Sequence, residues 1–145
     1  MGTSDLGTAG NRNEANCTWG DATYTVSFSF NGVDTISTTT SAPCGAVMDW
    51  TITPTCNAGG WNTMDVLVVD RSTTTGIAFE NVDLNGNSLG NFGSFDLLGA
   101  PGFQNWTITA FDFTQPWTIA GDLVIQGFSG SAELNKLQLT VGCLP

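Results

Sequence analysis

The feature that most constrains the fold of this 145-residue chain is a run in which apolar and polar side chains alternate with a period of two. The run spans residues 23–30 (TYTVSFSF). Successive side chains of a β-strand point to opposite faces of a sheet, so the pattern predicts a strand with one buried face. Asn31 and Gly32 follow, a pair that suits a type I′ turn, and residues 33–39 are predicted to form the returning strand. The apolar members of the run are Tyr24, Val26, Phe28 and Phe30.

Similar short segments recur along the chain, separated by Gly, Pro and Asn. Residues 64–69 (MDVLVV) are nearly all apolar, which predicts a strand buried on both faces at a sheet centre. A change of phase near Asn135 and Lys136 indicates a β-bulge. No window shows the apolar periodicity and caps of a helix. The other predicted strands are 48–53, 77–84, 94–98, 106–113, 117–119, 123–126 and 132–141.

About ten short strands, with no helix to make parallel crossovers, predict an antiparallel β-sandwich of jelly-roll or immunoglobulin-like type. A closed barrel is the alternative architecture, and the absence of a fixed repeat length argues against a β-solenoid. The length fits a single domain. Residues 1–16 contain one large apolar side chain, Leu6, and are expected to be a flexible or partner-held tail. The packed domain is therefore expected to span residues 17–145.

Four cysteines stand without any Cys-x-x-Cys spacing, which favours disulfides over a zinc ribbon or a thioredoxin-like site. Of the three possible connectivities, Cys44–Cys56 with Cys17–Cys143 is favoured. The first bridge would close a local Pro/Gly-rich excursion, and the second would join the two ends of the fold. Free buried thiols are the alternative. Disulfides imply a secreted or cell-surface protein, so the chain is expected to be a mature form whose leader has been removed. The alternative is a protein that starts at Met1 and is exported by another route.

Composition excludes several classes of function. The chain has 3 basic and 13 acidic residues and a formal net charge of −10, so it cannot neutralise a run of phosphates or dock on an anionic membrane. No apolar stretch approaches the roughly 20 residues that cross a bilayer. The absence of histidine removes Ser-His and Cys-His nucleophile activation and imidazole metal ligands. Paired carboxylates remain available to any acidic chain, but no motif here indicates catalysis, and we expect a non-enzymatic protein.

Two small-molecule sites are candidates. Asp83, Asn85 and Asn87 alternate oxygen-bearing side chains as in a calcium loop, although the spacing departs from an EF-hand and an ordinary Asn-Gly hairpin turn is the simpler interpretation. Calcium is therefore only an optional cofactor. Trp61 and Asn62, in a Gly-rich loop, could form a sugar platform, as could Trp117 after its proline, while packing in the core is the alternative role for each tryptophan.

The preferred function is self-assembly. Soluble sheet proteins often protect their edge strands with lysine, and this chain has one Lys and two Arg. The nearly uncharged segments 35–40 and 107–109 are therefore predicted edges to which another chain could add, with Leu6 and the tail as a further contact. The sequence thus predicts a non-catalytic, extracellular structural or adhesive subunit that forms homo-oligomers or polymers. The alternative is a carbohydrate-binding module with glycan as its partner. Neither reading involves nucleic acid or membrane insertion.

Overall fold

The computed structural model describes residues 20–42, 48–51, 62–70, 76–92, 102–109, 111–127 and 136–142, and these contain nine strands and no helix. The predicted strand 94–98 and the bulge at Asn135 lie outside the described residues. The strands are β1 (Ala22–Phe30), β2 (Thr35–Thr40), β3 (Met48–Thr51), β4 (Thr63–Asp70), β5 (Gly76–Leu84), β6 (Asn87–Phe92), β7 (Gly102–Ile108), β8 (Trp117–Gln126) and β9 (Lys136–Gly142).

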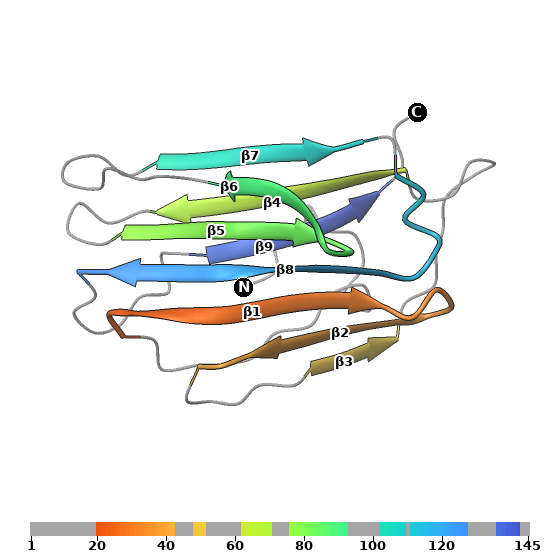
Figure 1. The fold of residues 1–145 in the computed structure, drawn as a ribbon, viewed down its shortest axis with the longest axis horizontal. Helices are drawn as coiled ribbons and strands as arrows, with labels where there is room; N and C mark the ends of the chain where they lie inside the picture. Colours follow the sequence, from red (N-terminus) through yellow and green to blue (C-terminus); the bar gives the residue numbers. More distant parts are fainter. Residues whose placement is uncertain are drawn as a thin grey trace.

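The strands form two antiparallel sheets, which confirms the all-β class (Figure 1). One sheet has six strands in the order β3-β2-β1-β8-β5-β6, and the other has three in the order β7-β4-β9. The predicted edge at residues 35–40 is wrong, because β2 pairs with β1 on one side and with β3 on the other. The sequence could not show this, because the residue pattern of segment 35–40 is the same whether or not a short strand pairs with its second side.

Strand β1 follows its predicted alternation. Tyr24, Val26 and Phe30 are buried and Phe28 is half-buried, while Thr and Ser occupy the other face. Strand β4 departs from its prediction. It lies at the centre of the smaller sheet, but Asp65 and Leu67 are only half-buried, so the strand is not buried evenly on both faces.

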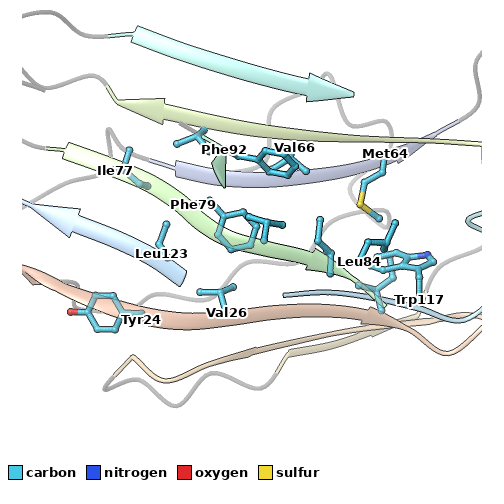
Figure 2. Packing of buried hydrophobic residues seen from close by; sticks show 14 of the residues in the cluster. Tyr24, Val26, Met64, Val66, Ile77, Phe79, Leu84, Phe92, Trp117 and Leu123 are labelled. Atoms are coloured by element: carbon cyan, nitrogen blue, oxygen red, sulfur yellow. The ribbon is translucent and has the colours of Figure 1, made fainter. Parts of the chain in front are cut away.

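The two sheets share one core. Strand β4 contributes Met64 and Val66, which belong to the same buried cluster as Phe79 and Leu84 of β5 and Trp117 of β8 (Figure 2). Met64, Val66 and Phe79 are fully buried. This shared burial of apolar side chains is the main favourable term that holds the two sheets together.

Strand β8 is continuous where the sequence predicted two strands, 117–119 and 123–126. The interruption at Ala120, Gly121 and Asp122 looks like a turn in sequence, but the segment pairs with β1 without a break in register. On its other side β5 has a bulge between Glu80 and Asp83, and Asn81 there takes a φ of 51°. A side chain at position 121 would collide with β5, so glycine is required by the close approach of the two strands.

Two Asn-Gly pairs make different turns. Asn85 and Gly86 have φ values of 52° and 78° and join Leu84 to Asn87, as a two-residue type I′ hairpin requires. The predicted type I′ turn at residues 31–32 is wrong. Asn31 there accepts, through its Oδ1, hydrogen bonds from the backbone N–H groups of residues 33, 34 and 35, at 2.8, 2.9 and 3.0 Å. The Asn31 side chain thus takes the place of a backbone carbonyl as acceptor, and these bonds stabilise a longer loop.

Candidate functional site

The candidate functional site is a sheet edge. Four strands have a neighbour on only one side among the described residues, namely β3, β6, β7 and β9. An unpaired strand presents free N–H and C=O groups to any other strand, so proteins usually protect such edges by shortness, charge, proline or bulges. The four edges differ in how they meet this requirement, and the difference between β9 and β7 is a single lysine.

Three of the four edges carry a protective feature. Strand β3 has four residues and includes Asp49. Strand β6 pairs irregularly with β5, with register shifts around Val82 and a left-handed Gly90 at φ 86°. Strand β9 begins with a lysine, Lys136. Each feature disfavours the regular addition of another strand.

Strand β7 carries none of these features. Its seven residues, GFQNWTI, include no charge and no proline, and they pair with β4 in one unbroken register from Gly102 to Ile108. Residues 97–111 as a whole are uncharged. We call the side of β7 that faces away from β4 the β7 edge. Figure 1 shows β7 at the border of the molecule, beyond β6.

Side chains on the two faces of β7 explain how the strand is held. On the inner face the Trp106 ring stacks on Phe92 of β6, with centroids 5.1 Å apart and planes 21° apart. On the outer face Thr107 donates a hydrogen bond from Oγ1 to Oδ1 of Asp65, at 2.5 Å. Phe103, also on the outer face, is 73% exposed. The strand is therefore fixed to both sheets, while the Phe103 ring faces solvent and no strand of the described residues pairs with the other side of β7.

A shallow groove on the outer face of the six-stranded sheet is a second surface of interest, with a volume of about 550 Å³. Ser27 and Thr39 share a hydrogen bond of 2.6 Å between their hydroxyls, and Asn81 donates from Nδ2 to Oδ2 of Asp122 at 2.8 Å. The lining combines hydroxyls, acids and small residues and has no basic side chain: Thr25, Val26, Ser27, Thr39, Thr40, Ser41, Asn81, Asp83, Ala120, Gly121 and Asp122.

The residues predicted for calcium lie in the β5–β6 hairpin, and some of their oxygens bond to the backbone. Oδ1 of Asp83 accepts a hydrogen bond from the Gly86 N–H, at 2.9 Å. Oδ1 of Asn85 accepts one from the Thr118 N–H at 2.8 Å, and Nδ2 of Asn87 donates to the Leu84 carbonyl at 3.3 Å. These bonds form the hairpin and attach it to β8. A cation at Asp83 stays a prediction.

Of the three residues predicted to bind sugar, the structure describes Asn62 and Trp117. Trp117 is 2% exposed and donates a hydrogen bond from Nε1 to the Phe113 carbonyl at 3.2 Å, so it has no face open to a ligand and belongs to the core. Asn62 is exposed, and its N–H bonds to the Gly142 carbonyl at 3.1 Å. Trp61 lies outside the described residues.

The remaining predicted residues, Leu6 and the four cysteines at 17, 44, 56 and 143, also lie outside the described residues. The described segments contain no cluster of three acidic, cysteine or histidine side chains arranged to hold a metal. They contain no helix long and apolar enough to span a membrane.

Sequence reasoning predicted an edge at residues 107–109 but missed Phe103 and the preceding part of β7, although the uncharged stretch from residue 97 to 111 was visible. Comparisons with family models, with curated proteins and with solved structures find no match to this chain. The surfaces above therefore have to be interpreted from their own chemistry.

Proposed function

We propose that this protein is a non-catalytic, extracellular structural or adhesive subunit, built as a disulfide-stapled β-sandwich of jelly-roll or immunoglobulin-like type, that assembles into a fibre or surface layer through its sheet edges. The observation that carries the proposal is the β7 edge: seven uncharged residues in regular register, among them Phe103, which is 73% exposed. An uncharged edge in regular register favours strand addition. Leu6 and residues 1–16 are a second proposed contact.

The first test is the effect of Phe103→Asp on the size of the particle in solution. Wild-type protein is expected to shift from monomer to oligomer as its concentration rises. Burying a phenylalanine contributes about 1.5–3 kcal/mol, and 1.4 kcal/mol corresponds to a tenfold change in affinity. We therefore expect Phe103→Asp to weaken self-association by about tenfold or more. Analytical ultracentrifugation over a concentration series measures this.

The matched control is Val33→Asp. Val33 is 70% exposed in the β1–β2 loop, so the substitution makes the same charge change at a similarly exposed apolar site away from β7. It is expected to leave self-association almost unchanged. A wild-type particle that stays monomeric at every concentration, or equal weakening by both variants, would contradict assembly through the β7 edge.

The dependence of self-association on salt concentration and pH is an independent test. Two copies with a net charge of −10 repel one another, and added salt screens this repulsion. Self-association is therefore expected to strengthen several-fold with ionic strength, and to strengthen as the pH falls toward the isoelectric point near 4.1. A partner of opposite charge would show the reverse dependence on salt.

We propose carbohydrate binding as a second candidate function, favoured by the groove across β2, β1, β8 and β5. Hydroxyls such as those of Thr25 and Thr39 both donate and accept hydrogen bonds, and the carboxylates of Asp83 and Asp122 accept them, which suits the hydroxyls of a sugar. With no basic side chain in the lining, the groove disfavours anionic ligands. The groove is a different surface from the predicted tryptophan site, of which Trp117 is buried and Trp61 stays a prediction.

The test uses neutral tetrasaccharides of glucose, mannose and N-acetylglucosamine at millimolar concentration. We expect one of them to shift the backbone amide NMR signals of Thr25, Ser27 and Asp122, and we expect Asp122→Asn to weaken the effect at least several-fold. Asp112→Asn, in the exposed loop before β8, is the control and should not alter binding. Titrations that leave the groove amides unmoved with every sugar would rule out this second function.

A further inference from the structure

We propose that the occupant of the β7 edge is β7 of a second copy of this chain, paired antiparallel about a two-fold axis that passes beside Asn105. This inference rests on the proposed function and specifies its partner and register. The two smaller sheets would then merge into one continuous sheet with the strand order β9-β4-β7-β7-β4-β9. Each copy would contribute the same surface, as a two-fold interface requires.

The register follows from the length and regularity of the strand. Asn105 is the central residue of Gly102–Ile108, so centring the pair there gives all seven residues a partner, and any other centre leaves some unpaired. Phe103 then lies directly opposite Thr107 of the second copy on the outer face. Opposed residues in antiparallel strands are close enough for their side chains to pack. The exposed ring of Phe103 gains an apolar contact with the threonine methyl.

Asn105 is self-complementary at the centre. Its amide has both donor N–H groups and an acceptor oxygen, so two copies of the same side chain can satisfy each other. Asn105 is exposed on β7, which leaves it accessible to a second copy. A charged residue at this position would meet its own charge across the axis, and β7 has none.

The acidic residues of β4 permit this register despite the net charge. Asp65 pairs with Thr107, and Asp70 pairs with Gly102. In the merged sheet, the residues of the second copy's β4 that lie in line with these two acids are therefore not acidic. With strands about 4.8 Å apart and residues about 3.4 Å apart, Asp70 of one copy and Asp65 of the other approach to about 15 Å at the closest. This exceeds the screening length of about 8 Å at physiological salt.

The two-fold pairing has a consequence for assembly. It uses the β7 edge of both copies completely, so it closes on itself and makes a dimer. The dimer is then the repeating unit, and any longer fibre or layer has to grow through another contact, such as the one proposed for residues 1–16. A head-to-tail pairing of β7 with a different strand would instead propagate without limit.

The experiment is disulfide trapping with Asn105→Cys in the full chain. Opposed Cα atoms in an antiparallel pair lie about 4.5–5.5 Å apart, within the roughly 4.4–6.8 Å that a disulfide spans. Under mild oxidation, at concentrations where the protein self-associates, we expect a covalent dimer whose cross-linked peptide joins the two residues at position 105. Mass spectrometry of the digest distinguishes this link from any that involves the four native cysteines.

Phe103→Cys and Thr107→Cys are the matched controls. Position 103 lies about 14 Å from its own counterpart in this register, so neither variant should cross-link with itself, whereas a mixture of the two should form the 103–107 link. If Phe103→Asp weakens self-association but no link forms at position 105, the two-fold register is overturned while assembly through the β7 edge stands. A wild-type protein that is monomeric throughout overturns the proposed function itself.

Discussion

Replacing Trp117 with alanine is expected to lower the free energy of unfolding by about 3–5 kcal/mol, the usual cost of removing a large aromatic ring from a packed core. Trp117 is 2% exposed and lies among other rings, with its centroid 6.1 Å from that of Phe30 and 6.2 Å from that of Phe113. Its Nε1 also donates a hydrogen bond to the Phe113 carbonyl. Urea denaturation followed by far-UV circular dichroism measures the loss.

Two further variants keep this prediction testable if the alanine protein fails to fold. Trp117→Phe retains a ring but loses the hydrogen bond to Phe113, and is expected to cost about 1–2 kcal/mol. Phe103→Ala removes an aromatic ring that is 73% exposed and is expected to change the stability of the monomer by no more than about 0.5 kcal/mol. Similar losses for Trp117→Ala and Phe103→Ala would show that position 117 is not in the core.

Replacing Gly121 with alanine is expected to destabilise the protein by about 2–3 kcal/mol, toward the upper end of the usual cost of overpacking. A Cβ at this position would lie 2.8 Å from the Glu80 carbonyl oxygen and 2.8 Å from Cε2 of Phe79. The β5 bulge places that carbonyl there, and a backbone atom paired in the sheet cannot move aside cheaply. The midpoint of urea unfolding should fall accordingly.

Gly142→Ala is the matched control for Gly121→Ala. Gly142 is also a strand glycine, in β9, but a Cβ there would meet nothing closer than Oγ1 of Thr63 at 3.8 Å. Gly142 is the last residue of β9, so the gain of roughly 0.5–1 kcal/mol that alanine gives over glycine in the middle of a strand is realised only in part. This variant should therefore be close to neutral. Adding Phe79→Leu to Gly121→Ala should give a smaller total loss than the sum of the single variants, because the smaller side chain relieves part of the clash. If the losses of stability of the two single variants simply add, the clash at position 121 does not involve Phe79.

The candidate assembly site was only partly predictable. Residues 107–109 were predicted as an edge that another chain could join, and β7, which includes residues 107 and 108, does lie at a sheet edge. The same reasoning chose residues 35–40, which β3 covers. Whether a strand lies at an edge depends on which strands pair with it. Pairing involves residues far apart in the sequence, so local composition does not determine it.

The turns and the tryptophans show the same limit of prediction from local sequence. Asn31 and Asn85 are each followed by glycine, yet only the second pair forms a two-residue type I′ turn, because Asn31 bonds instead to three backbone N–H groups. Trp117 was open to either a binding or a packing role. Its neighbours Phe30 and Phe113 come from separate segments, and their convergence on the indole determines that it is a core residue.

The sequence by itself determined the all-β class and the buried face of β1, because a period of two is set by the geometry of a single extended strand. It also determined that the chain is acidic and has few lysines to guard its edges. The tertiary structure alone decided which strand is left with an exposed, regular edge, and which glycine sits beneath a bulge in β5. Both depend on contacts between residues far apart in the chain, whose distances are fixed only when the sheets pair and pack.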